Sequence, residues 1–347
     1  MVTPIRRRLF FFVLFFILNI FSGQDRNCFA QDKAISDSLK LVYEEGAFSP
    51  EEKLELLKQL VINEYEADQI VSYSEDLIAL SLAADSQQHL FTGYLHKGNG
   101  LRLKGDLPQA LNSYFDASRI AIEQNNQKDL GLVNVTIADV YSIMGNHDSS
   151  VRYYKTAWGI LKAEKDTINY ASALLNAGDE YFNYGKLDSA LLLFKESGKL
   201  FDEVNSEIGK AYNLGNIGLV YAEKGEYEIA ESNINQAVEI LEKLGDYYPI
   251  CVYLAYMSDI YSEKGDDLNA LNFAYGSLEL ATQYKFKAEI SDANLRLSKI
   301  QERLGNPDEA LSYFKSHILF RDSVNNVSSV QEMETIRADF EISQKQL

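Results

Sequence analysis

An internal period of forty residues is the feature that most constrains how this chain can fold. A glycine marks each period: Gly105, Gly145, Gly185, Gly225, Gly265 and Gly305. Seven positions before each glycine stands a small residue: Gly98, Ala138, Gly178, Gly218, Ser258 and Ser298. Five positions after each glycine stands another: Ala110, Ser150, Ala190, Ala230, Ala270 and Ala310. Periods of this length are typical of stacked repeats, so the sequence predicts one long array rather than separate compact domains.

Within one period the residues predict two antiparallel helices. Leu214, Gly218 and Tyr221 are spaced by three and four residues, which places them on one helix face. The glycine that follows can end this helix, since glycine adopts the left-handed cap conformation without steric cost. Asn306 and Pro307 suit the start of a second helix. Neither helix can bury its apolar face alone, so the pairs must stack into an all-α solenoid.

Aromatic residues keep the same register and carry a family resemblance. Four positions before the glycine stand Tyr141, Tyr181, Tyr221 and Tyr261, and nine positions after it stand Tyr114, Tyr154, Phe194 and Phe314. The pattern resembles the tetratricopeptide repeat in a long, forty-residue variant, over residues 91 to about 317. The resemblance implies a right-handed superhelix of helix pairs. Gln301 and Ala274 depart from the aromatic positions, which weakens single copies of the pattern but not the whole.

The first thirty residues have the pattern of a secretory signal peptide. Arg6, Arg7 and Arg8 precede an apolar run from Leu9 to Leu18, and a small-residue site ends at Ala30. This run is short for a membrane span, which needs about 20 residues. We therefore expect cleavage and export to the periplasm or cell envelope, with no membrane insertion afterwards, and an uncleaved anchor is the alternative.

The remaining chain divides by register. Residues 31–90 predict amphipathic helices that include a degenerate repeat, which would cap the stack. Residues 91–326 hold the six repeats. Residues 327–347 predict a C-terminal amphipathic helix, because apolar residues recur there every three or four positions.

Charge and cysteine content narrow the range of partners. The full chain has a net charge of −18, and loss of residues 1–30 would leave 29 basic and 50 acidic residues, a net charge of −21. Such an acidic protein would repel nucleic acid and anionic lipid surfaces. Cys251 would be the only cysteine left, so packing rather than an internal disulfide must hold the fold.

The sequence shows no pattern that predicts catalysis. The four histidines have no metal-ligand spacing and there is no CxxC motif, so we expect no metal, no cofactor and no enzymatic activity. A hydrolase that uses groove carboxylates is the weakest alternative. Glutamate and aspartate are plentiful, but on solvated helix faces they ordinarily serve solubility.

The resemblance implies instead that the first helix of each pair lines a concave groove for a partner protein or peptide. The groove positions carried over onto this sequence are Asp139, Asn176, Asp179, Phe182, Asn216, Glu223, Tyr256 and Asp259. Asparagine amides can bond a partner's backbone, although they could equally bridge neighbouring helices. Because the middle of the groove is acidic, a basic or neutral partner is favoured.

The tail adds a second functional reading. Residues 318–347 resemble, loosely, the connector helix of exported repeat-containing sensors of the Bacteroidetes, which leads to a membrane span and a kinase, cyclase or transcription-regulator output. The primary hypothesis is therefore a non-enzymatic protein-binding scaffold. The alternative is an extracytoplasmic sensory module of a bacterial signalling system. A plainer interpretation of the tail is a last helix that caps the solenoid.

Overall fold

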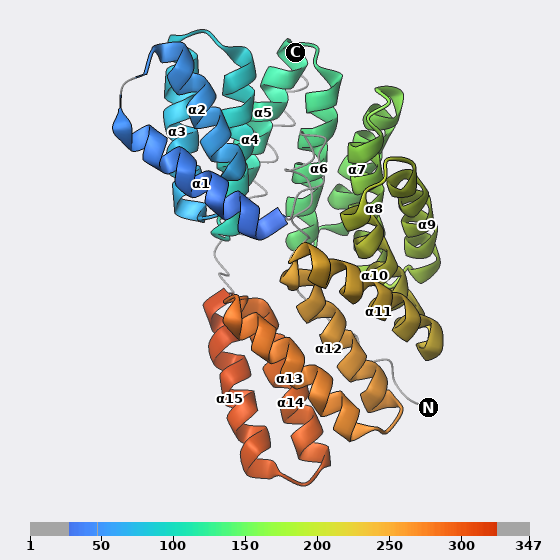
Figure 1. Ribbon diagram of the computed structural model, residues 1–347. Coiled ribbons are helices and arrows are strands. Elements are labelled where there is room, and N and C mark those ends of the chain that lie inside the picture. The colour runs from blue at the N-terminus through green and yellow to red at the C-terminus, as the bar shows by residue number, and fades with distance from the viewer. Residues whose placement is uncertain (1–27, 47, 325–347) are drawn as a thin grey trace.

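The computed structural model describes residues 28–46 and 48–324, and these residues form helices without any strand (Figure 1). The helices are α1 Cys28–Glu45, α2 Pro50–Asn63, α3 Ala67–Ala83, α4 Gln87–Leu103, α5 Leu107–Glu123, α6 Gln127–Ile143, α7 His147–Ala163, α8 Thr167–Asn183, α9 Leu187–Glu203, α10 Glu207–Glu223, α11 Tyr227–Leu244, α12 Tyr247–Glu263, α13 Asp267–Gln283, α14 Lys287–Arg303 and α15 Pro307–Val324. The prediction of an all-α solenoid is confirmed. The predicted signal peptide and tail helix lie outside the described residues, apart from the segment 28–30 at the start of α1.

Six helix pairs, from α4 with α5 to α14 with α15, repeat the predicted forty-residue unit. We call the even-numbered helix of each pair its first helix and the odd-numbered helix its second helix. Each first helix has 17 residues, and short turns join the helices. The pair α2 with α3, of 14 and 17 residues, precedes the six, and its role as a degenerate capping repeat stays a prediction.

Small residues let the two helices of a pair approach closely. A Cβ atom added to Gly178 of α8 would lie only 2.4 Å from the ring of Phe194 on α9. Both that ring and the ring of Tyr154, one repeat earlier, are almost completely buried. The small residue before the turn and the large one after it are therefore complementary, as the sequence predicts.

Left-handed turns occur at two places in the described repeats, and only one of them was expected. The six glycines of the period have φ between 70° and 79°, which confirms their role in ending the first helix. A second positive φ ends the second helix, at positions where the sequence is not uniform. These residues are Asp85, Asn125, Lys165, Asn205, Gly245 and Lys285.

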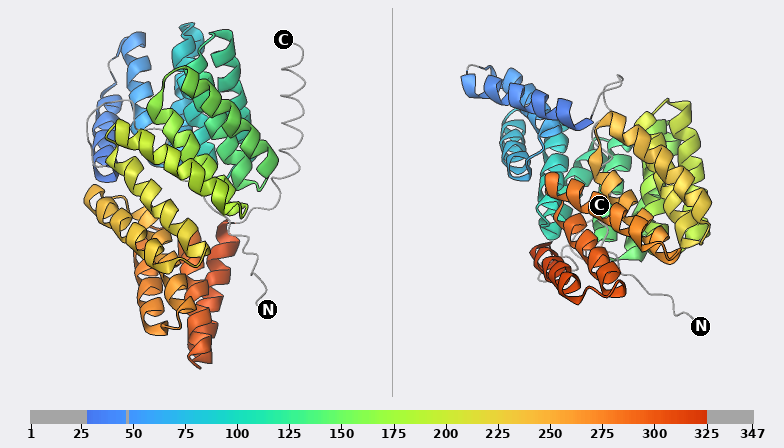
Figure 2. Two further views of the ribbon diagram at one scale, coloured as in Figure 1. Left: turned by 90° about the vertical axis from the view of Figure 1, so that its right-hand side faces the viewer. Right: turned by 60° about the horizontal axis from the view of Figure 1, so that its bottom comes forward.

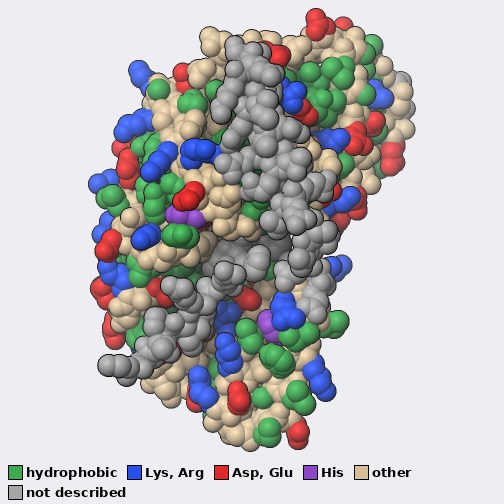
Figure 3. Space-filling model, turned by 180° about the vertical axis from the view of Figure 1, so that it is seen from behind, with side chains coloured by type: hydrophobic (Ala, Val, Ile, Leu, Met, Phe, Trp, Pro, Cys, Tyr) green, Lys and Arg blue, Asp and Glu red, His purple; other side chains and the backbone are tan. Residues whose placement is uncertain are grey.

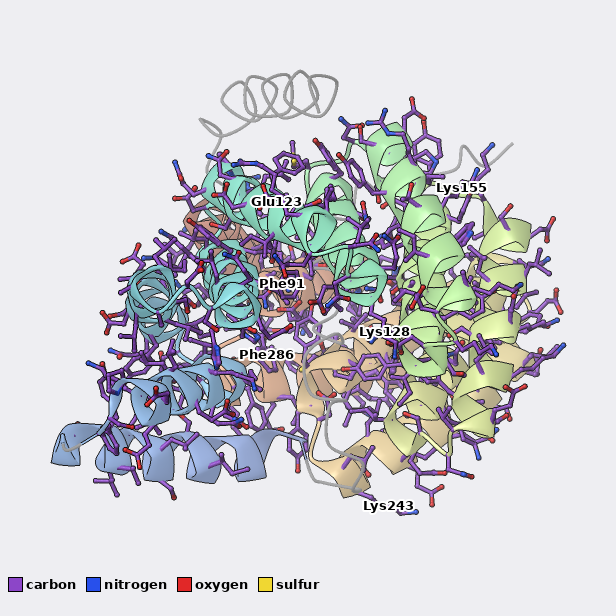
Figure 4. All side chains as sticks on the ribbon, turned by 90° about the horizontal axis from the view of Figure 1, so that it is seen from above. Phe91, Glu123, Lys128, Lys155, Lys243 and Phe286 are labelled. Carbon is purple, nitrogen blue, oxygen red and sulfur yellow. The ribbon has the colours of Figure 1, made fainter. Side chains whose placement is uncertain are left out.

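The first helices lie on the inner side of the curve. Each of α6, α8, α10 and α12 contacts the next first helix along the chain, whereas the second helices meet only their sequence neighbours to any comparable extent. Figure 2 shows the pairs following a curved path, and Figure 4 places Lys155 of α7 and Lys243 of α11 at the periphery, with Phe91 of α4 nearer the middle. Within the part of the chain described here, no helix is long and apolar enough to span a bilayer.

Candidate partner-binding face

Hydrogen bonds between successive first helices form what we call the inner ladder. Asn176 Nδ2 donates to Asp139 Oδ1 at 3.2 Å, and Asn216 Nδ2 donates to Asp179 Oδ1 at 2.7 Å. Arg296 makes the equivalent contact, with its Nη2 atom 3.1 Å from an oxygen of Asp259. Partners in each of these rungs are 37 residues apart. These bonds therefore join successive first helices at one fixed place in the repeat.

Between α10 and α12 an apolar contact takes the place of the hydrogen bond, and we count it as the fourth rung of the ladder. In the corresponding place Leu219 and Tyr256 are 5% and 3% exposed, and both belong to one buried cluster. The ring of Tyr256 on α12 also lies 6.2 Å, centroid to centroid, from the ring of Phe182 on α8. Because α10 lies between those two helices in the chain, this contact shows how tightly the inner side curves.

The predicted site asparagines are buried rather than open. Asn176 is 1% exposed and Asn216 is 3% exposed, while Asp139 is also buried. Their amides bridge neighbouring helices, which is the second of the two roles considered for them above. Binding of a partner's backbone by these amides stays a prediction, and it would require that a rung of the ladder open.

Tyrosine hydroxyls from the second helices complete part of the ladder. Tyr154 donates to Asp139 at 2.6 Å, and in the previous repeat Tyr114 donates to Asn99 at 2.8 Å. One repeat later the equivalent ring belongs to Phe194, which has no hydroxyl. Asp179 Oδ2 is buried and has no hydrogen-bond partner among the described residues.

Burial also changes the acidity of these carboxyl groups. It raises the pKa of Asp139 to about 6, an effect that the charge of Arg102 and the hydrogen bond from Tyr154 partly oppose. Burial raises the pKa of Asp179 well above its usual value, and the carboxylates of Asp139 and Glu180 raise it further. The buried part of the ladder is thus less negative than its aspartates suggest.

The accessible carboxylates lie further along the first helices. Glu223 at the end of α10 is exposed, and so is Glu263 at the same position of α12. Asp179, Asp259 and Phe182 are half-buried. We call these five residues the acidic inner face, since four of them are acidic and Phe182 supplies an apolar contact.

A polar cluster at the start of α7 was not anticipated from the sequence. Glu180 of α8 is bonded by the imidazole of His147, 2.7 Å away, and by the hydroxyl of Ser142. The ring of His147 stacks on Tyr184 with centroids 3.6 Å apart. Serine and histidine both bond the carboxylate here, which joins α6, α7 and α8 rather than building a nucleophile with its base. The sequence does contain a sign of this cluster. Glu180 occupies a position where four other repeats have valine or isoleucine, which becomes visible only when the repeats are aligned.

Metal binding finds no support in the geometry. Among residues 28–46 and 48–324, no three histidine, cysteine or acidic side chains are grouped so that they could hold a metal ion.

Comparison with known families agrees with the repeat geometry. Residues 211–247, which comprise most of α10 and all of α11, match the family model described as tetratricopeptide repeat. The same helix pair occurs six times in one register in the described residues. The matched segment is a tetratricopeptide repeat. No curated relative matches it by sequence.

Solved structures with the same fold are distant in sequence from this chain. Aspartyl phosphate phosphatase F from Bacillus subtilis has a TM-score of 0.63 at 16% identity, over 85% of this chain and 76% of its own. A Rap protein complexed with competence and sporulation factor has a TM-score of 0.59 at 13% identity, over 90% of this chain and 93% of its own. The Cut9–Hcn1 hetero-tetramer of the APC/C has a TM-score of 0.60 at 14% identity, over 88% of this chain and 52% of the other. At these identities the likeness shows the fold alone.

Proposed function

We propose that this protein is a non-enzymatic scaffold that binds a partner peptide or helix along the acidic inner face. The observation that carries the proposal is the position of Glu223 and Glu263, which are exposed on the inner side of successive repeats. Asp179 and Asp259, which also belong to the inner ladder, add half-buried carboxylates on the same side. A basic or neutral segment complements this charge, whereas an acidic segment or nucleic acid would be repelled.

The chemistry of the face supports an extended or helical partner rather than a small molecule. The accessible groups are spread over α8, α10 and α12, and among them Phe182 offers an aromatic surface. Repeat arrays use such extended surfaces for binding other chains. One protein of the same fold is known as a complex with competence and sporulation factor, which agrees with the proposal without showing it for this chain.

Binding can be tested with charge reversal at exposed positions. Three matched peptide pools, basic, neutral and acidic, would be passed over the immobilised protein, and the strongest binder measured by fluorescence anisotropy. We expect the basic pool to be retained, with binding that weakens as salt rises. The double variant Glu223→Lys and Glu263→Lys should weaken it about tenfold.

A matched control separates the inner face from overall charge. Glu242 is exposed on the second helix α11, so Glu242→Lys changes charge away from the proposed face. This variant should bind as the unaltered protein does. Equal retention of the acidic and basic pools, or equal loss in both kinds of variant, would refute binding at the acidic inner face.

Export and a sensory role are further proposals that rest on the chain ends. They depend on residues 1–30 and 327–347, which lie outside the described residues except for 28–30. Intact mass and fractionation of the native product would test them. A product that begins at Gln31 and is not membrane-bound supports an exported scaffold. A longer, membrane-bound product supports the sensory module, and a membrane-bound product of this length that keeps Met1 would show that the signal is not cleaved.

A further inference from the structure

The last described helix leaves an apolar face uncovered. Leu311 and Phe314 of α15 are 51% and 44% exposed, and Ile318 on the same face is half-buried. We call these three residues the end face. In Figure 3, apolar side chains gather on the lower part of the molecule, which holds the C-terminal helices.

Every earlier repeat buries the residue that corresponds to Phe314. Tyr114, Tyr154 and Ile234 are 0% exposed, and Phe194 is 1% exposed. In those repeats the first helix of the following repeat packs against the second helix, as α6 does against α5 and α14 against α13. Exposure of the end face therefore follows from the absence of a further first helix among the described residues.

The sequence supplies such a helix in register. First helices begin forty residues apart at Thr167, Glu207, Tyr247 and Lys287, so the next one would comprise residues 327–343. Those residues carry apolar side chains every three or four positions. We propose that residues 327–343 of this chain form the first helix of a seventh repeat and cover the end face.

Contacts between earlier repeats specify which residues would meet. Gly93 of α4 lies against Ile78 of α3, and Gly198 of α9 has its Cβ position 3.9 Å from the Cβ of Asn213 on α10. Shifted by whole repeats of forty residues, both contacts predict that Met333 packs against Ile318. Gly100 of α4 lies against Val71 of α3 in the same way, which corresponds to Phe340 above Leu311. Both proposed pairs are apolar, as a buried contact requires.

Ion pairs between neighbouring repeats also have a counterpart in residues 327–347. Lys104 pairs with Asp68 at 2.6 Å and Lys224 with Asp188 at 2.9 Å, each joining the end of a first helix to the start of the preceding second helix. Asp308 stands in the corresponding acidic place, and Lys345 is one residue from the basic one.

The pair Ala338 and Asp339 falls in the register of Ala138 and Asp139. Asp339 would then extend the row of inner aspartates by one repeat. This inference does not depend on partner binding.

A disulfide experiment tests the contact in the full-length chain. A Cβ separation of 3.9 Å suits a disulfide, so Ile318→Cys with Met333→Cys should cross-link within one molecule under mild oxidation. Gly198→Cys with Asn213→Cys is the positive control, because those positions belong to described helices. Ile318→Cys with Ser343→Cys is the negative control, since ten helical residues displace the second thiol by roughly 15 Å. All three pairs would be made in a background without Cys28 and Cys251.

Hydrogen exchange gives a second readout that does not depend on cysteines. In the unaltered chain, amides of residues 330–340 should exchange about a hundredfold more slowly than in an isolated peptide. Phe340→Asp should abolish that protection, whereas Ser343→Asp should leave it. Unprotected amides, equal cross-linking of the Ile318→Cys thiol with either tail position, or cross-links between two molecules at the end face would overturn the proposal.

Discussion

Replacement of Phe194 with tyrosine should stabilise this protein, although it places a hydroxyl in a fully buried site. Phe194 occupies the position of Tyr154, whose hydroxyl donates to Asp139 at 2.6 Å. The equivalent carboxyl group in the repeat of Phe194 is that of Asp179, whose Oδ1 accepts from Asn216 and whose Oδ2 is buried and has no partner among the described residues. A hydroxyl added at the end of this ring would therefore meet an acceptor that lacks a donor.

The expected gain follows from the kind of hydrogen bond that forms. Bonds to charged groups contribute about 1.5–3 kcal/mol and bonds between neutral groups about 1 kcal/mol. Burial raises the pKa of Asp179 and so disfavours its charged form, and we therefore expect a gain between these two cases, of about 1–2 kcal/mol. The gain should grow as pH rises, since the ionised carboxylate is the stronger acceptor.

Urea unfolding of the full chain gives the measurement, with Phe194→Tyr tested alone and together with Asp179→Leu. The apolar pair Leu219 and Ile234, in the next repeat, shows that the fold accepts leucine opposite an apolar ring position. With leucine at position 179 the new hydroxyl has no acceptor, so the tyrosine should then cost about 1–3 kcal/mol. If Phe194→Tyr is equally destabilising in both backgrounds, the described geometry of Asp179 is wrong.

Three further predictions concern pH, turns and close packing. Burial raises the pKa of Asp139 and of Asp246 to about 6, above the unfolded value near 4, so the folded state binds more protons between these values. The free energy of unfolding should therefore decrease as pH rises from about 4 to 6, by up to about 2–3 kcal/mol per group. Urea midpoints at pH 4.5 and pH 7.5 measure this change. Lys165 has φ of 57°, so Lys165→Gly should stabilise the turn by about 1 kcal/mol in thermal unfolding. Gly178→Ala should destabilise by about 1–3 kcal/mol, whereas Gly159→Ala, whose Cβ would meet nothing within 4 Å, should stabilise slightly; circular dichroism melts compare the two.

The fold could be predicted from the sequence because the period fixes residue types at each turn and contact. Gly185 and Gly225 are needed for a backbone conformation that other residues adopt at a cost. The turn after the second helix was missed because no single residue type marks it. Asn125 and Lys165 adopt the same left-handed conformation, and no shared side chain marks it. There the reversal of the chain, fixed by packing of the helices on either side, determines the backbone.

The candidate site was only partly predictable. Register assigned Asn176 and Asn216 to equivalent positions of successive first helices, and in the structure each bonds an aspartate of the preceding repeat. Their burial depends on how closely successive first helices approach, and no single repeat encodes that distance. The equal separation within each asparagine–aspartate pair is a signal in retrospect, because it joins two rows one repeat apart.

The inner ladder has consequences for where function can reside. Its four rungs differ in chemistry: two join an aspartate to an amide, one is apolar and one joins Asp259 to Arg296. A repeat moved to another place in the array would bury a polar group opposite the wrong partner, so the rungs favour one order of neighbours. The fully buried members of the ladder, Asp139, Asn176 and Asn216, are poor candidates for recognition, since a partner would have to replace their hydrogen bonds. Recognition is better sought one helical turn further along these helices, where Glu223 and Glu263 are exposed.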